Sequence, residues 1–272
     1  MTPGAGEPAV ELVGVGKAFP GGRGRGEVRA LVGVDLTVAP GEFVTFIGPS
    51  GCGKSTLLRI VADLTEPTAG TVRVNGKTAR QARLDQDYGI AFQQAGLMDW
   101  RTVARNVELP LELRGWDRRR RRQHALQLLE LVGLPDVAES RPAELSGGMQ
   151  QRVAIARALA TGPKLLLMDE PFGALDEMTR ERLQAELTRI ARESAATVAF
   201  VTHSIPEAVY LSDRVVVLSA RPGRVSAVVD VELGDRTEDT RQAPEFFATV
   251  TEVREALRGR TARAAVPAAE ER

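Results

Sequence analysis

Apolar residues recur along the chain with two different spacings, and each spacing predicts a kind of element. Short runs that alternate with polar residues or are wholly apolar predict strands, and apolar residues three or four positions apart predict helices. We therefore expect strands at residues 9–15, 30–38, 43–47, 71–75, 88–92, 165–169, 197–201 and 214–218. We expect helices at residues 55–63, 177–193, 206–211 and about 244–258.

The order of these elements predicts an α/β domain. The first two strands flank a Gly- and Arg-rich turn at residues 20–26, which indicates an antiparallel β layer. In the second half of the chain strands and helices alternate, which predicts a parallel sheet with crossover helices. Between these parts, residues 102–160 show helical spacing that is interrupted at Gly115 and at residues 133–135. We therefore predict a helical subdomain inserted over about residues 95–160.

Composition limits the domain count and the partners. With 272 residues, the chain suits one sizeable domain with an insertion, or at most two small domains. It carries 36 basic and 36 acidic residues, so no overall field attracts nucleic acid, and we expect no nucleic-acid partner. Apolar runs are far shorter than the roughly 20 residues of a spanning helix, and residues 1–8 read as a frayed tail without a signal peptide. The single cysteine, Cys52, excludes an internal disulfide and suits a reducing cytoplasm.

A glycine-rich loop lies between a predicted strand and a predicted helix, and it matches the pattern G-x-x-x-x-G-K-[ST]. In such a loop the backbone N–H groups surround the β-phosphate of a nucleotide, the lysine reaches the β- and γ-phosphates, and the serine binds Mg²⁺. The alternative is a chance glycine turn. We predict that the whole loop binds ATP, with the small Cys52 side chain directed away from the phosphates. Its residues are Gly48, Pro49, Ser50, Gly51, Cys52, Gly53, Lys54, Ser55 and Thr56.

Two carboxylates follow a buried strand of the predicted parallel sheet. Asp169 and Glu170 stand at its carboxyl end, where ligands gather in open α/β sheets. We predict that Asp169 holds Mg²⁺ through water and that Glu170 is the general base that polarises the attacking water. His203 follows the strand at 197–201 in the same manner, as a candidate contact to the γ-phosphate and a support for Glu170. The alternatives are that the carboxylates cap a following helix and that the histidine is structural.

A third motif precedes an apolar helix. Residues 145–152 (LSGGMQQR) resemble the signature of ABC-transporter ATPases. Ser146, Gly147 and Gly148 begin the helix, so a hydroxyl, amide N–H groups and the helix dipole are available to an anion. The resemblance implies that this anion is the γ-phosphate of ATP held by an opposite subunit, where Gln150 also contributes. It further implies an α/β fold with a P-loop NTPase, RecA-like core. An ordinary N-capped helix is the alternative.

The same resemblance assigns further residues. It implies that Gln93 contacts Mg²⁺ or water and signals to a membrane subunit, that Asp176 lies in the loop that crosses the dimer interface, and that His203 is the switch histidine. Phe19 aligns with the aromatic residue that stacks on adenine. The implied catalytic residues are Glu170, His203, Lys54 and Gln93, and the implied Mg²⁺ ligands are Ser55, Gln93 and, through water, Asp169.

A finer resemblance concerns residues 96–107 and 203–224, which are similar to the nitrate, sulfonate and taurine importer branch of that family. It implies a peripheral protein on the cytoplasmic face of the membrane that couples ATP hydrolysis to solute uptake. The implied partners are a second copy or a like subunit in a nucleotide-sandwich dimer, transmembrane permease subunits and, indirectly, an extracytoplasmic solute-binding protein. Residues 9–234 would form the ATPase domain, and 235–272 a partly disordered tail with one helix.

Several alternatives remain open at this stage. Trp100 is either an interface anchor in a groove that receives a permease helix or a core residue. The chain could instead be an ABC exporter ATPase, a soluble ABC-type ATPase of DNA repair or translation, or a P-loop kinase or GTPase. The arginines at residues 118–122 are compatible with nucleic-acid phosphates, although such a run is typical of a solvated helix face. A kinase or GTPase leaves the signature unexplained.

Overall fold

The computed structural model describes residues 7–21 and 26–259, and within them the chain forms two β-sheets. The larger sheet has the strand order β10-β9-β3-β8-β7-β6. Neighbouring strands are parallel except for β10, which runs antiparallel to β9. The strands are β3 (Phe43–Ile47), β6 (Tyr88–Ala91), β7 (Leu165–Asp169), β8 (Thr197–Val201), β9 (Arg214–Leu218) and β10 (Val225–Asp230).

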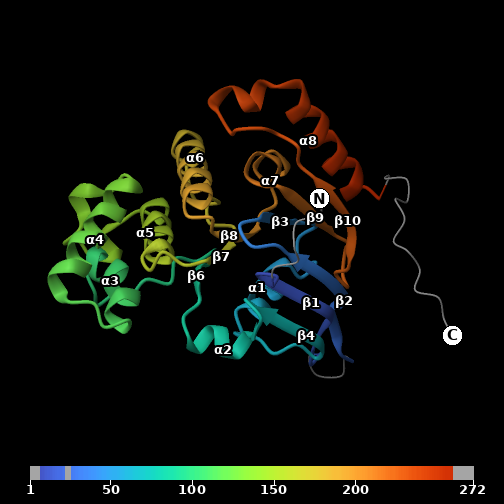
Figure 1. The fold of residues 1–272 in the computed structure, drawn as a ribbon, viewed down its shortest axis with the longest axis horizontal. Coiled ribbons are helices and arrows are strands. Elements are labelled where there is room, and N and C mark those ends of the chain that lie inside the picture. The colour runs from blue at the N-terminus through green and yellow to red at the C-terminus, as the bar shows by residue number, and fades with distance from the viewer. Residues whose placement is uncertain (1–6, 22–25, 260–272) are drawn as a thin grey trace.

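Side chains of the large sheet alternate between two apolar cores. In β3, Val44 and Phe46 pack into the core that includes α1, whereas Phe43 and Ile47 pack into the core that includes α6, α7 and α8. Because both faces are covered, the central strands are wholly buried, as expected for parallel strands. Figure 1 shows α1 on one side of the sheet and the other three helices on the opposite side. These helices are α1 (Lys54–Val61), α6 (Glu177–Glu193), α7 (Ile205–Leu211) and α8 (Pro244–Leu257).

The smaller sheet is antiparallel and covers α1. Its strand order is β2-β1-β4-β5, and its inward side chains, among them Leu12, Val15 and Val34, join the α1 core. This confirms the predicted antiparallel β layer. It also contains β4, which follows α1 in the sequence and pairs with β1. The strands are β1 (Val10–Phe19), β2 (Val28–Val38), β4 (Ala69–Val74) and β5 (Lys77–Thr78).

A helical block lies to one side of the sheets (Figure 1), and its residues are inserted between β6 and β7 in the sequence. It contains α3 (Val103–Leu113), α4 (Arg118–Leu131) and α5 (Gly147–Leu159). The helical spacing predicted for 102–160, with its interruptions at Gly115 and 133–135, is wrong for residues 136–146, where the backbone forms only the short 3₁₀ turns η1 (Pro135–Val137) and η2 (Pro142–Glu144). Gly133, at a φ of +69°, ends α4, and Pro135 and Pro142 begin the two turns.

Four short elements were not predicted. They are β5, α2 (Ala79–Leu84), β10 and the 3₁₀ turn η3 (Glu238–Gln242). Each is too short to show a clear hydrophobic period on its own. After η3, α8 lies against α7, β9 and β10, at the position predicted for a tail helix.

Parts of three expectations lie outside the described residues. These are residues 1–6 of the predicted frayed tail, 22–25 of the turn, and 260–272 of the predicted disorder. Within the part of the chain that is described, no helix has the length and apolar character needed to cross a bilayer.

Candidate functional site

The glycine-rich loop connects the carboxyl end of β3 to α1. Gly53, directly before α1, has a φ of 109°, which side chains other than glycine rarely adopt. A Cβ atom there would lie 2.7 Å from Cδ2 of Leu31 and 3.0 Å from the carbonyl oxygen of Ala30. Glycine is therefore needed for both conformation and space. The tight turn places the positive end of α1 at the carboxyl edge of the sheet, where it favours a bound anion.

Lys54 is the first residue of α1 and is only 7% exposed. Its Nζ atom donates hydrogen bonds to the carbonyl oxygens of Gly48 (2.8 Å) and Pro49 (3.2 Å). The ammonium group is thus held against the loop at the N-terminal end of α1. Cys52 is buried, with its Sγ atom 4.0 Å from Nζ of Lys54.

Ser55 and Asp169 come together although they are far apart in the sequence. The hydroxyl of Ser55 donates a hydrogen bond of 2.8 Å to Oδ1 of Asp169, the last residue of β7. Burial raises the pKa of the Asp169 carboxyl, and the hydrogen bond from Ser55 opposes that shift. A buried carboxylate with one neutral partner is suited to compensation by a cation.

Glu170 and His203 extend this edge of the sheet. The backbone N–H of Glu170 donates to the carbonyl oxygen of Val201 (2.9 Å), which ends β8, and Oε2 of Glu170 lies 3.1 Å from Nδ1 of His203. Glu170 has a φ of +47°, in the left-handed region that is costly for a non-glycine residue. Strained backbone of this kind is concentrated at functional sites.

An open cleft of about 370 Å³ brings the predicted nucleotide contacts together. It contains Phe19 from the end of β1, Gln93 from the segment after β6, and Glu170. Phe19 is 40% exposed, and Nζ of Lys17 lies 5.1 Å from the centre of its ring. The full lining is Phe19, Val28, Ala30, Ser50, Gly51, Gly53, Lys54, Ser55, Thr56, Gln93, Glu170 and Arg221.

Arg221 is a cleft residue to which sequence analysis assigned no role. It follows β9, and its Nε atom donates to the carbonyl oxygen of Gly51, at 3.3 Å. The sequence did contain a signal for this position. Arg221 lies shortly after a predicted strand, and parallel strands end at the edge of the sheet where ligands bind. Gly48, Pro49 and Cys52 do not line the cleft; the first two act through their carbonyl contacts with Lys54.

The serine-glycine motif begins α5 and packs against the segment that leads into α6. Ser146 caps α5 by accepting a hydrogen bond from the N–H of Met149, at 3.3 Å. A Cβ atom on Gly148 would lie 3.0 Å from the carbonyl oxygen of Ala174, whereas one on Gly147 would meet nothing within 4 Å. Gly147 therefore leaves the N-terminal tip of α5 open to a large ligand.

Gln150 and Asp176 complete this second surface. Nε2 of Gln150 donates to the carbonyl oxygens of Pro142 (2.9 Å) and Leu145 (3.3 Å), so this side chain supports the preceding turn. Asp176 caps α6, and the hydrogen bond from the Thr179 N–H lowers the pKa of its carboxyl. None of the residues predicted to contact ATP from an opposite subunit lines the nucleotide cleft of its own chain: these are Ser146, Gly147, Gly148, Gln150 and Asp176.

A protein-family model described as ABC transporter matches residues 31–173. The match includes the phosphate loop, the serine-glycine motif and both strand-end carboxylates. This chain belongs to the ABC transporter family.

Its relatives in the family include import subunits. The chain is 44% identical over 258 residues to the nitrate import ATP-binding protein of Synechocystis sp., covering 92% of this chain and 96% of the relative. It is 46% identical over 233 residues to the taurine import ATP-binding protein of Rhizobium johnstonii, covering 85% and 88%. A solved dimeric ATP-binding cassette in a post-hydrolysis state, bound to ADP and Pi, matches with a TM-score of 0.76 and 36% identity, over 82% of this chain and 99% of that one.

These comparisons confirm that the chain is an ABC ATPase with the P-loop NTPase, RecA-like core predicted from the sequence, and that it resembles the importer branch. The family's nucleotide is ATP, and the cleft beside the phosphate loop is the candidate site for it. The kinase and GTPase alternatives are wrong.

The donor set of this ABC cleft also fits Mg²⁺. Magnesium prefers few protein oxygens together with water and substrate phosphates. The Ser55 hydroxyl and the Asp169 carboxylate lie 2.8 Å apart beside the cleft, and the Gln93 side chain lines it. Among the described residues there is no group of three or more His, Cys, Asp or Glu that could hold a metal ion.

Proposed function

We propose that this chain is the ATP-hydrolysing subunit of an ABC importer and works as a head-to-tail dimer with one ATP in each interface. The separation of two surfaces supports this proposal. The phosphate loop, Glu170 and Gln93 share one cleft, while the open tip of α5 at Gly147 lies outside it. A second copy would supply the missing N–H groups and helix dipole to the γ-phosphate.

Each residue has a defined task in this mechanism. Lys54 and the loop N–H groups bind the phosphates, and Phe19 stacks on the adenine. Glu170 accepts a proton from the attacking water, and His203, hydrogen-bonded to Glu170, orients that carboxylate. Ser55, Gln93 and, through water, Asp169 would hold Mg²⁺, which neutralises charge on the phosphates when bound. Ser146, Gly147 and Asp176 of the second copy close the site, so hydrolysis requires a closed dimer.

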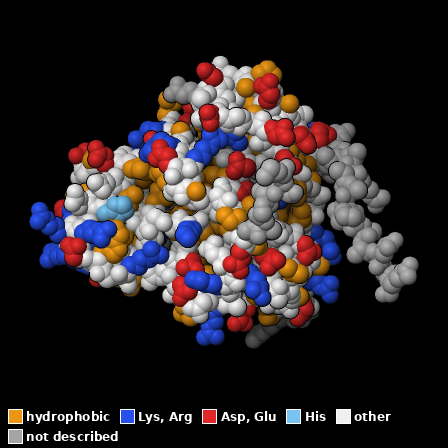
Figure 2. Space-filling view, in the orientation of Figure 1, with side chains coloured by type: hydrophobic (Ala, Val, Ile, Leu, Met, Phe, Trp, Pro, Cys, Tyr) orange, Lys and Arg blue, Asp and Glu red, His pale blue; other side chains and the backbone are white. Residues whose placement is uncertain are grey.

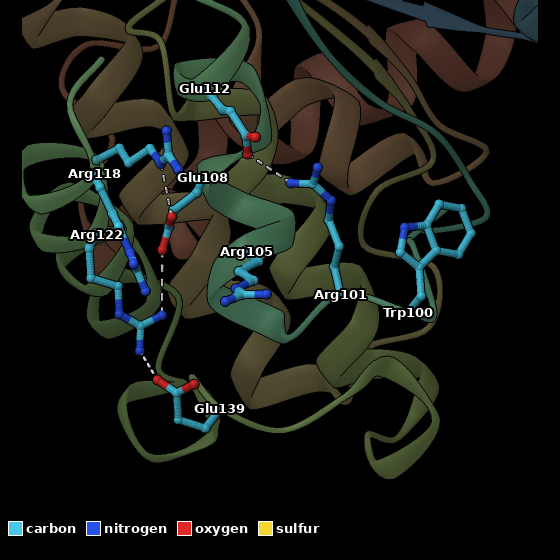
Figure 3. Close-up of a pocket in the computed structure, with 9 residues that line it drawn as sticks. Trp100, Arg101, Arg105, Glu108, Glu112, Arg118, Arg122 and Glu139 are labelled. Carbon is cyan, nitrogen blue, oxygen red and sulfur yellow. Dashed lines mark hydrogen bonds and ion pairs between the residues drawn. The ribbon is translucent and has the colours of Figure 1, made fainter. Parts of the chain in front are cut away.

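A cleft in the helical block supports a permease contact. It has a volume of about 570 Å³ and lies between α3 and α4 (Figure 3). Trp100 at its edge is 73% exposed, so the core alternative for this tryptophan is wrong. An exposed tryptophan beside arginines has the composition of an interface anchor. Basic side chains also gather over this block in Figure 2.

The charge of the cleft indicates the chemistry of the partner. Its lining has five arginines and three glutamates. Arg101 pairs with Glu112 at 2.9 Å, and Arg121 pairs with Glu108 at 3.2 Å. Among the described residues the side chain of Arg105, central in Figure 3, has no hydrogen-bond or ion-pair partner. We therefore propose that a permease helix inserts an acidic side chain here, beside Trp100. The complete lining is Trp100, Arg101, Arg105, Glu108, Glu112, Arg118, Arg121, Arg122 and Glu139.

The proposed setting follows from the named relatives. We propose residues 9–234 as the ATPase domain, a peripheral position on the cytoplasmic face of the membrane, and uptake of nitrate, a sulfonate such as taurine, or a related small solute. An extracytoplasmic binding protein would deliver that solute to the permease. The permease and the binding protein, not this chain, would select it.

Crosslinking tests the dimer directly. Two preparations of the Glu170→Gln protein, one with Ser50→Cys and one with Ser146→Cys, are mixed with ATP and a short bifunctional maleimide. We expect a crosslinked heterodimer that depends on ATP, because Cys52 is 1% exposed and the reaction is confined to the new thiols. Thr249→Cys on α8 replaces Ser146→Cys as the control. Equal crosslinking of the two mixtures, or none with ATP bound, contradicts the head-to-tail arrangement.

Pull-down tests the permease contact. Trp100→Ala and Arg105→Glu should each abolish capture of the permease subunits while leaving ATP binding by the isolated chain unchanged. Arg80→Glu, in α2, is the matched charge reversal. Normal capture by Arg105→Glu would exclude the acidic contact.

A further inference from the structure

The C-terminal segment contacts a row of buried polar side chains that ends beside His203. Arg241, in η3, places its guanidinium 3.7 Å from the centre of the Tyr210 ring, and its Nη2 atom donates to Oε1 of Gln184, at 2.5 Å. Arg241 also lies 3.7 Å from the carboxylate of Glu181. The arginine thus joins η3 to both α6 and α7, and Figure 1 shows the following helix, α8, alongside α7.

Gln184 carries this contact through α6. It is 2% exposed, and its Nε2 atom donates to Oε1 of Glu207, at 2.7 Å. The amide has only one possible orientation, because the guanidinium of Arg241 can only donate and a carboxylate can only accept. If either partner is removed, a buried amide atom is left without a hydrogen bond. The three side chains of Arg241, Gln184 and Glu207 therefore form one ordered polar chain, here called the polar triad.

Glu207 is the member of the polar triad that lies nearest to the proposed hydrolytic residues. It lies in the first turn of α7, four positions after His203, and its backbone N–H donates to the Ser204 hydroxyl, at 3.4 Å. Its side chain lines the same cavity of about 90 Å³ as Glu170, His203 and Arg180. Burial raises the pKa of the Glu207 carboxyl, and hydrogen bonds from Thr202 and Gln184 oppose that shift. Thr202 and Ser204, the neighbours of His203 in the chain, thus hydrogen-bond to the side chain and the backbone N–H of Glu207, respectively.

We propose that Arg241 and Gln184 are positioning residues that act through Glu207 to hold the turn bearing His203 in place, so that the C-terminal segment sets the rate of ATP hydrolysis. The inference rests on the proposed role of His203. It does not involve nucleotide binding, because none of the three side chains lines the ATP cleft. A small displacement of a reacting group lowers the rate of a step much more than it lowers affinity.

The first test is Arg241→Met in the full chain, which keeps the length of the side chain and removes its donors. We expect kcat for ATP hydrolysis to fall about tenfold, with KM and the calorimetric Kd for ATP within about twofold of the parent protein. Tm should fall by a few degrees, because the buried Gln184 amide loses its donor. Arg189→Met is the matched control, because Arg189 lies on α6, the helix of Gln184, but within the described chain its ion pairs are with Glu186 and Glu193, outside the triad. A purely structural role would instead lower ATP affinity together with kcat.

The second test exchanges the side-chain types of Gln184 and Glu207. Gln184→Glu alone places two carboxylates side by side and should lower kcat as Arg241→Met does. Adding Glu207→Gln restores a donor opposite an acceptor, so the double variant should recover to within about threefold of the parent. A folded double variant with no more activity than Gln184→Glu overturns the proposal, as does an unchanged kcat in Arg241→Met. If His203→Ala hydrolyses ATP at the parent rate, the proposed role of His203 is wrong. If His203→Ala is impaired but Arg241→Met hydrolyses ATP at the parent rate, only the proposed coupling to the C-terminal segment is wrong.

Discussion

Nδ1 of His203 lies 3.1 Å from Oε2 of Glu170, and the two residues follow neighbouring parallel strands, β7 and β8. The hydrogen bond from the Glu170 N–H to Val201 keeps the two strand ends in register. An imidazole N–H that donates to this carboxylate fixes its orientation, as a general base requires. The pair therefore explains why an exposed histidine occurs beside the phosphate loop.

Glu170→Gln should leave ATP binding intact and reduce turnover by at least about a hundredfold. The amide keeps the shape of the side chain but cannot accept the proton of the attacking water. ATP would then persist in the interface and hold a dimer, detectable by light scattering with ATP and Mg²⁺. Glu186→Gln, which changes a half-buried carboxylate on α6 that pairs with Arg189, serves as the control. A Glu170→Gln protein that hydrolyses ATP at the parent rate would rule out a general-base role.

Lys54→Ala should lose most of its affinity for ATP. The ammonium group, held by the carbonyl oxygens of Gly48 and Pro49, is the main positive charge of the loop, and hydrogen bonds to a charged group contribute about 1.5–3 kcal/mol. Calorimetry should therefore show a Kd at least about tenfold higher. Lys164→Ala, which removes an exposed lysine, should bind ATP normally. An unchanged Kd for Lys54→Ala would show that the phosphates bind elsewhere.

Asp169→Asn should stabilise the nucleotide-free protein at neutral pH while abolishing Mg²⁺-dependent hydrolysis. Burial raises the pKa of Asp169, so the native state binds the proton more tightly than the unfolded state, and stability is lost as pH rises through the native pKa. Asparagine still accepts the Ser55 hydrogen bond but carries no charge to bury. A stabilisation of about 1 kcal/mol corresponds to roughly 2–4 °C in Tm for a protein of this size.

The pH dependence of this stabilisation is its control. The Tm difference between Asp169→Asn and the parent should be present at pH 7 and shrink as pH falls toward the ordinary carboxyl pKa of 3.8. Differential scanning calorimetry over that range measures it. A difference that does not vary with pH would show that charge burial is not its cause.

Local sequence patterns were enough to predict the phosphate loop and the two carboxylates. Gly53 and Lys54 lie within one short motif, and Asp169 directly follows an apolar run, so their positions depend on nearby residues and on the strand order. Arg221 was not assigned a role because its contact with Gly51 joins residues 170 positions apart. The pairing of β10 with β9 and the contact of Arg241 with Gln184 likewise depend on tertiary packing. The spacing of hydrophobic residues predicts local elements and not such contacts.

Gly148→Ala should weaken dimer formation while leaving ATP binding by the monomer intact. The new methyl group would lie 3.0 Å from the carbonyl oxygen of Ala174, so α5 and the segment before Asp176 must move apart. Both belong to the surface proposed to meet the ATP of the second copy. ATPase activity should therefore fall at least about tenfold and rise again at higher protein concentration, since mass action favours the dimer. Gly234→Ala, where a Cβ atom meets nothing within 4 Å, should behave like the parent. A Gly148→Ala protein that binds ATP more weakly, and whose activity does not depend on protein concentration, would contradict this prediction. The tip of α5 would then not act across a dimer interface.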